Sequence, residues 1–401
     1  MSLKSSRPQE AGAFIEIDSQ FLAAGANILT MRKRAGLAVT AFAVACLLVM
    51  IALLYGVSRQ NPEPACNGKT LAQWLVLLDS DPTHKAENDA AETAITTIGP
   101  KALPVLVRIL QLRPPSPFFA RASQWAVRLH LLRAQMLSLQ ERQYRAARAC
   151  CLLSEVKHFD ISPAIPELAY HFTNNPSDRL EPFAWGLVFS GLQGLSIVTN
   201  AMAKDPSYWV REEAARALWI TPRVRTPEVA TALLAATSDS NVEVRVTAIL
   251  SLESFVRQQG LDALIVPGVM PCLQDTNNQV RKWTVDLLSA SNFDPVEQRL
   301  VVSALTNALA DSDSSVRQAI ERNLGRLGKE PGMAVPALIA QLGSTSAAEF
   351  VTASRALMAF GSNAAPALEP LLHRVRDPDP AIQTAASEAL RYIDTFQPRR
   401  Y

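Results

Sequence analysis

The sequence has little glycine and few stretches in which apolar and polar residues alternate. Glycine accounts for 16 of the 401 residues, and alternation is the pattern expected of a half-buried β-strand. Because 48% of the residues are hydrophobic, the chain still has ample material for a core. The composition therefore predicts an all-α protein with enough chain for two or three ordinary domains.

Motifs of common enzyme classes are also absent. The sequence contains no HExxH, no GxSxG and no GxGxxG. Asn67-Gly68-Lys69-Thr70 resembles the end of a P-loop, but Glu63 stands where that loop needs glycine. Glu167 and His171 lie one helical turn apart and supply at best half a metal site, so we interpret them as an ordinary surface pair. We therefore expect no catalytic residue, no cofactor and no metal.

Cysteine is scarce as well, and no two cysteines have the CxxC spacing. Cys150 and Cys151 are adjacent in a predicted helix, where successive side chains point about 100° apart. A disulfide between them would break that helix, so we expect buried free thiols. For a periplasmic domain, so few cysteines indicate that stability comes from stacking and not from crosslinks.

What the sequence does contain is one stretch that recurs four times from Asp205 to Gly328. In each copy an Asp stands five residues before a Val-Arg pair, and a Leu follows the Val by eight residues. The valines are residues 210, 244, 280 and 316, so the steps are 34, 36 and 36 residues. Repetition at this period is typical of a helical solenoid.

Each copy contains the pattern of two helices. Val316, Ile320 and Leu324 are four residues apart, which places them on one face of a first helix, called A. A second apolar stretch follows as helix B, for example at 334–342, 364–372 and 102–110. Glycine ends several A helices, and proline is expected in the first turn of the next helix. One such hairpin cannot bury its apolar face alone, so neighbouring hairpins must stack.

These motifs resemble HEAT repeats, including the variant called PBS-lyase HEAT-like. The resemblance covers residues 205–393, with weaker copies at 349–357 and 382–390. Toward the N-terminus 87–95 is a good match, whereas 141–204 fits only loosely. It implies an α-solenoid of stacked antiparallel helix pairs. We expect the solenoid to span 69–396 and to be followed by a tail, 397–401.

The recurring Asp and Arg residues admit two interpretations. The arginines could bind an anionic ligand, or each could pair with a turn Asp of its own or a neighbouring repeat, as in HEAT proteins generally. Because Asp and Arg recur together, the sequence favours a structural ladder of ion pairs. Its predicted members are Asp205, Arg211, Asp239, Arg245, Asp275, Arg281, Asp311 and Arg317.

An uncharged apolar run of 23 residues, 35–57, precedes the repeats. It is long enough to cross a bilayer as a helix, although a buried core helix and a cleaved signal peptide are alternatives. Three basic residues, 32–34, flank its N-terminal side, against Arg59 alone on the other. The positive-inside rule then predicts a cytoplasmic N-terminus and an extracytoplasmic solenoid.

The organisation before the solenoid follows from that helix. Residues 1–34 are predicted to be a cytoplasmic segment, whose true start could be Met31, and 58–68 a linker. The next residues, GKTLAQWL, begin a predicted helix at 69–78 that caps the first repeat. Anchor, linker and this segment together resemble a bacterial group of membrane-anchored HEAT proteins. The resemblance implies a single-pass protein of the inner (plasma) membrane.

A basic segment at 113–148 contains a single acid, Glu141. It could form a docking face for an acidic protein, an anionic lipid or a phosphate. The interpretation that we favour is a solvated helix flank whose arginine stems cover apolar surface. The candidate interaction patch comprises Arg121, Arg128, Arg133, Arg142, Arg145 and Arg148.

Taken together, the sequence predicts a non-catalytic scaffold that binds protein partners at the membrane or in the periplasm, and that contacts the bilayer through 35–57. The alternative is a ligand- or chromophore-binding lyase or chaperone-like factor, of the kind that gave PBS-lyase HEAT-like repeats their name. Nucleic-acid binding is not expected, because the net charge is only +2.

Overall fold

A computed structural model describes residues 63–78, 82–113, 137–174, 179–219, 224–256, 260–290 and 293–395. The chain divides into two units, Met1–Pro64 and Ala65–Tyr401. All the helices described below belong to the second unit. The predicted cytoplasmic segment, the membrane helix at 35–57 and the tail at 397–401 lie outside the described residues.

The second unit begins with a short hairpin and not with a helix. Strands β1 (Ala65–Cys66) and β2 (Lys69–Thr70) pair antiparallel. Asn67 and Gly68 connect them with φ values of 50° and 75°, as a tight two-residue hairpin turn requires. The sequence analysis missed these strands because two residues are too few to show alternation, and the linker predicted for 58–68 overlaps them.

Helix α2 (Leu71–Leu77) follows, two residues later than the predicted start of 69–78. Thr70 caps it, since its hydroxyl accepts a hydrogen bond from the amide of Gln73. The predicted apolar face, which includes Leu71 and Trp74, is buried. The indole N–H of Trp74 donates to the carbonyl of Cys66 at 3.0 Å, which ties the helix to the hairpin.

The first repeats comprise η1 (Pro82–His84), α3 (Lys85–Ile98), η2 (Gly99–Ala102), α4 (Leu103–Gln111), α6 (Leu139–Lys157), η3 (Ser162–Ala164), α7 (Ile165–Asn174), α8 (Glu181–Phe189) and α9 (Leu192–Lys204). The region 141–204, which matched the repeat pattern only loosely, thus folds as two further hairpins. Its A helices α6 and α8 pack against each other, and so do its B helices α7 and α9.

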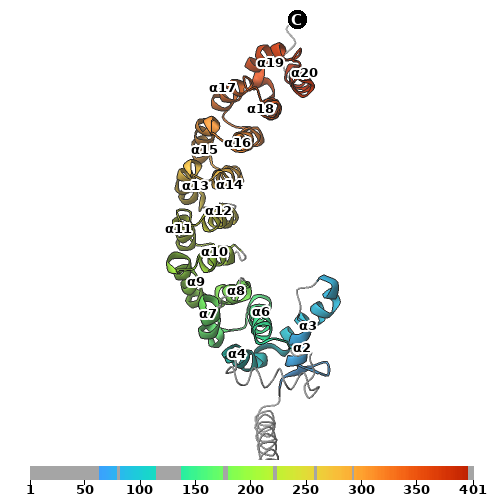
Figure 1. The fold of residues 1–401 in the computed structure, drawn as a ribbon, viewed down its shortest axis with the longest axis vertical. Coiled ribbons are helices and arrows are strands. Elements are labelled where there is room, and N and C mark those ends of the chain that lie inside the picture. The colour runs from blue at the N-terminus through green and yellow to red at the C-terminus, as the bar shows by residue number, and fades with distance from the viewer. Residues whose placement is uncertain are drawn as a thin grey trace, which may run out of the picture. The chain divides into compact units, whose positions relative to one another are not determined.

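The remaining A helices are α10 (Tyr208–Ala217), α12 (Val242–Val256), α14 (Asn278–Leu288), α16 (Ser314–Leu327), α18 (Ala347–Met358) and α20 (Pro380–Thr395). The B helices are α11 (Pro227–Ala236), α13 (Asp262–Val269) with η5 (Met270–Gln274), α15 (Pro295–Asn307) with η6 (Ala308–Ala310), α17 (Pro331–Gln341), and η7 (Gly361–Ala367) with α19 (Leu368–Arg374). Each A helix packs on the next, so A and B helices form two rows (Figure 1).

The core lies between these rows and repeats the sequence pattern. Val316, Ile320 and Leu324 of α16 are at most 1% exposed, as their spacing predicted. The glycine cap is also present, since Gly328 ends α16 in the left-handed conformation. The helix expected at 334–342 would have had Pro336 in its first turn, but α17 begins at Pro331, so Pro336 lies farther inside it.

By length and composition alone, one helical run of the described residues, Lys85–Gln111, could cross a membrane. Gly99 interrupts this run with a φ of 64°, and the run forms the hairpin of α3 and α4. Ile95 and Leu106 are completely buried against the rest of the solenoid. The run is therefore weak evidence for a membrane span.

Candidate functional site

Aspartates at the start of the A helices shape the turns between B and A helices. The carboxylate of Asp239 accepts a hydrogen bond from the amide of Asn241, two residues later, at 2.8 Å. The same bond forms at Asp205, Asp275 and Asp311. This local bond is the reason that Asp recurs at this point of the repeat.

The recurring arginines connect each of these turns to the next repeat. Nε and Nη2 of Arg245 donate to the two carboxylate oxygens of Asp275 at 2.8 and 2.9 Å, while Nη1 donates to the carbonyl of Asp239 at 2.9 Å. Arg211 binds Asp239 in the same way, and Arg281 binds Asp311. The sequence left open whether each Arg pairs with the turn Asp of its own repeat or of a neighbouring one. In the structure the carboxylate belongs to the Asp of the neighbouring repeat.

The ladder also perturbs the titration of its carboxylates. Burial opposes ionisation of Asp275, but hydrogen bonds from Arg245 and from the amide of Asn277 outweigh it and lower the pKa of Asp275. The pKa values of Asp239 and Asp311 are lowered for the same reasons. Because each guanidinium is already bound on two sides, the ladder leaves little donor capacity for a ligand.

The ladder continues past Arg317 with different residues. Ser344 stands where the next repeat should have Asp, and Nη2 of Arg317 donates instead to Glu349 at 2.5 Å. The hydroxyl of Ser344 donates to the other carboxylate oxygen of Glu349 at 2.7 Å. At the following junction Arg374, from the end of α19, pairs with Asp377 at 2.9 Å and stacks over the ring of Phe350.

Of the described arginines in the basic segment, Arg145 is buried, whereas Arg148 is half-buried and Arg113 is exposed. Arg145 is buried, donates to Glu141 at 2.6 Å and binds the carbonyls of Leu75 and Val76 at the end of α2. Arg148 pairs with Glu92 of α3 at 2.9 Å. Arg142 is half-buried, and Arg121, Arg128 and Arg133 lie outside the described residues. Arg145 is thus a connector between α6 and α2 and cannot belong to an exposed docking face.

Glu167 and His171 are not the surface pair that we expected. His171 is 8% exposed, stacks on Phe183, and its Nε2 lies 2.7 Å from the carbonyl of Leu110. Burial lowers the pKa of His171, while Glu167 pairs with Arg113 at 2.9 Å. No group of three or more His, Cys, Asp or Glu side chains in the described ranges is arranged to hold a metal ion.

Cys150 and Cys151 are free and buried in α6, as the sequence predicted. Burial raises the pKa of Cys150 to about 12. The thiol of Cys151 donates to the carbonyl of Pro182 at 3.2 Å. Both thiols are therefore protonated at neutral pH and unreactive.

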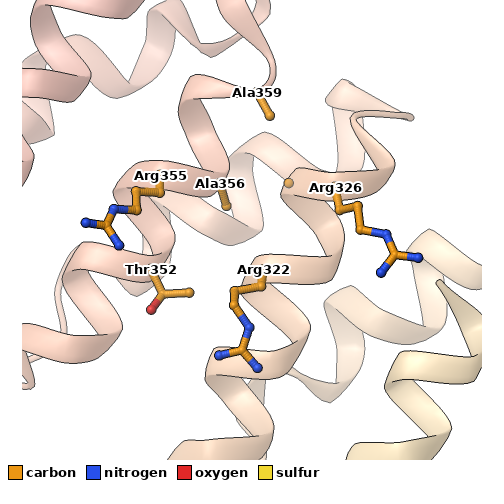
Figure 2. A pocket seen from close by; sticks show the side chains of 7 residues that line it. Arg322, Arg326, Thr352, Arg355, Ala356 and Ala359 are labelled. Carbon is orange, nitrogen blue, oxygen red and sulfur yellow. The ribbon is translucent and has the colours of Figure 1, made fainter. Parts of the chain in front are cut away.

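A groove of about 360 Å³ lies between α16 and α18 on the row of A helices (Figure 2). Its lining comes from two successive repeats and consists of Arg322, Gly325, Arg326, Thr352, Arg355, Ala356 and Ala359. Sequence reasoning missed it because its arginines are not in the recurring Val-Arg pair. A signal was present, since Arg322 lies six residues after Val316 and Arg355 six residues after Glu349, which occupies the same place in the next repeat.

Gly325 brings the two helices of the groove close together. A Cβ atom at this residue would lie 2.7 Å from the Cα of Ala356, nearer than real Cβ atoms come to backbone. One turn earlier on the same side of α16, Glu321 is completely buried, and neither of its carboxylate oxygens has a hydrogen-bond partner among the described residues. Burial raises the pKa of Glu321 to about 8, so the side chain is largely neutral at pH 7.

Comparison with known proteins agrees with this architecture. Residues 195–289 match the family described as HEAT repeats. No curated protein matches the chain. Among solved structures, Kap95p in its complex with RanGDP has a TM-score of 0.50 at 13% identity, over 80% of this chain and 50% of that chain.

Two shorter proteins are similar at lower scores. An archaeal HEAT-like repeats protein from Thermococcus onnurineus has a TM-score of 0.41 at 14% identity, over 58% of this chain and 97% of its own. An engineered protein has a TM-score of 0.43 at 20% identity, over 81% of this chain and 88% of its own. The family match at 195–289, together with the stacked hairpins and the ladder between them, shows that the chain contains HEAT repeats.

Proposed function

We propose that the protein is a non-catalytic scaffold that holds a protein partner at a membrane of the cell envelope. The solenoid provides the binding surface, and the apolar run at 35–57 provides the anchor. In a stacked array each hairpin contacts only its neighbours, so the outer sides of both rows are available to partners.

The observation that carries the proposal is the groove between α16 and α18. It is a recess built by two repeats, and its arginines extend from exposed positions. Arginine is enriched in protein–protein interfaces, where it supplies much of the binding energy. The fold similarity to Kap95p, whose structure is that of a complex with RanGDP, is compatible with such a role.

Site-specific photo-crosslinking in intact cells tests the scaffold. A photoreactive amino acid at Thr352 would report on the groove, and one at the exposed Thr231 of α11 would serve as the control on the row of B helices. We expect one dominant envelope protein to be captured from Thr352 and not from Thr231. If neither position yields a protein adduct, the scaffold proposal is wrong.

The membrane anchor is tested separately by protease protection. The length of 35–57 and the basic residues on its N-terminal side support an anchored protein with the solenoid outside the cytoplasm. Protease added to intact spheroplasts should then remove the solenoid. Protection of the solenoid until the cells are lysed would contradict this orientation.

A further inference from the structure

Two arginines of the groove between α16 and α18 have no partner in the described part of the chain. Arg322 and Arg355 are exposed and make no hydrogen bond or ion pair with a described residue. The third arginine differs, since Nη2 of Arg326 donates to the carbonyl of Ser289 at 3.0 Å. In Figure 2 Arg322 and Arg355 come from the two facing helices on either side of Thr352, whereas Arg326 extends in the opposite direction.

The acids of α16 and α18, Glu321 and Glu349, do not neutralise these two charges. Glu349 of α18 is already bound to Arg317 and Ser344. Glu321, next to Arg322 in the sequence, is buried, and its raised pKa keeps it largely uncharged at pH 7. No carboxylate lines the groove itself. The groove therefore presents a positive potential to whatever enters it.

The remaining lining gives the groove its shape. Gly325, Ala356 and Ala359 have short side chains or none, which leaves room for a polypeptide backbone. The hydroxyl of Thr352 donates to the carbonyl of Ala348 at 2.7 Å, so toward a ligand it can only accept. Donation to a ligand is thus left to the two guanidinium groups, whose geometry suits bidentate binding of carboxylates.

We infer that this groove binds an acidic polypeptide segment, with Asp or Glu side chains of the partner held by Arg322 and Arg355. The inference rests on the proposed scaffold function and adds the chemistry of the partner. A peptide fits better than an anionic membrane surface, because the groove is recessed between two helices. A single chain can enter such a recess, whereas a bilayer would meet only the outermost side chains.

Fluorescence anisotropy with a defined peptide tests the inference on the full chain in detergent. The probe is a labelled peptide in which glutamate alternates with serine, and the control peptide has glutamine in place of glutamate. We expect the wild-type protein to bind the glutamate peptide more tightly and to lose affinity as salt is added. Arg322→Gln and Arg355→Gln should each weaken binding about tenfold or more.

The matched control is Arg299→Gln on α15, which removes the same charge from an exposed side chain on the row of B helices. It should leave the affinity unchanged. Both groove arginines are exposed, so their substitution should move the melting temperature by no more than about 2 °C. Equal weakening by all three variants would mean diffuse electrostatic attraction and would overturn the inference.

Two other outcomes would also overturn it. One is that the wild-type protein does not distinguish the two peptides. The other is that Arg322 and Arg355 are needed for binding to phosphatidylglycerol vesicles and not for the peptide, which would assign the groove to lipid. If the crosslink from Thr352 still captures a protein in either case, the scaffold function stands and only the acidic partner is wrong.

Discussion

Replacement of Glu321 by glutamine should stabilise the solenoid at neutral and alkaline pH. Glu321 is 0% exposed, on the side of α16 that meets α18. Burial raises its pKa from the ordinary 4.5 to about 8. The charge of Glu349 raises it further, and the charges of Arg317 and Arg322 oppose the rise. In the folded protein Glu321 is therefore a protonated, neutral acid.

The sign of the pH dependence follows from that raised pKa. Between pH 4.5 and about 8 the unfolded chain has released the Glu321 proton, while the folded chain still holds it. The unfolded state thus binds fewer protons, so stability falls as pH rises through this window and levels off above it. Each pKa unit is worth about 1.4 kcal/mol, which makes the loss about 3 kcal/mol at pH 7.

Urea unfolding of wild type and Glu321→Gln across that pH range measures the effect. Because glutamine is nearly isosteric and does not titrate, the two proteins should have similar stability near pH 4.5 and diverge by about 3 kcal/mol at pH 7. Residual hydration of the carboxylate would reduce the difference to about half. The pH at which the difference stops growing reports the pKa of Glu321 in the folded state.

Glu349→Gln is the matched control, because Glu349 is the neighbouring acid at the same junction and its replacement should change the stability in the opposite direction. The pKa of Glu349 is lowered, since hydrogen bonds from Ser344 and Arg317 outweigh the effect of burial. Its replacement should therefore destabilise the protein above pH 4.5. Parallel stability curves for wild type and Glu321→Gln at all pH values would refute the reasoning about the buried neutral acid.

Two further predictions concern the contacts between repeats. Arg281→Lys keeps the charge but loses the two hydrogen bonds to the carboxylate oxygens of Asp311, each of 2.7 Å. It should lower the free energy of unfolding by about 1–2 kcal/mol. An unchanged urea midpoint would show that the ladder adds little to stability. Gly325→Ala would press a Cβ atom against Ala356 and should cost about 1–3 kcal/mol. A Cβ atom at Gly332 would have no neighbour within 4 Å, so the control Gly332→Ala should be neutral or slightly stabilising. Equal effects of the two substitutions on stability would contradict the close approach of α16 and α18 at Gly325.

The sequence by itself determined the repeat unit and its core. Val, Ile and Leu recur at helical spacing because each A helix has one face that must leave water, and only stacked copies can bury it. The turn Asp recurs because its carboxylate bonds an amide two residues away, as at Asp239. Such short-range requirements fix which residue types recur at which spacing, so they can be recognised in the sequence. The two-residue strands at 65–70 were missed because they are too short to show a repeating pattern.

The tertiary structure alone decided how the repeats meet. The position of one A helix against the next makes Arg245 bind Asp275 of the following repeat, 30 residues away. The same packing buries Glu321 and leaves Arg322, the adjacent residue, exposed at the groove. These contacts depend on the distance and rotation between helices far apart in the chain, and a periodic pattern within one helix contains no information about either.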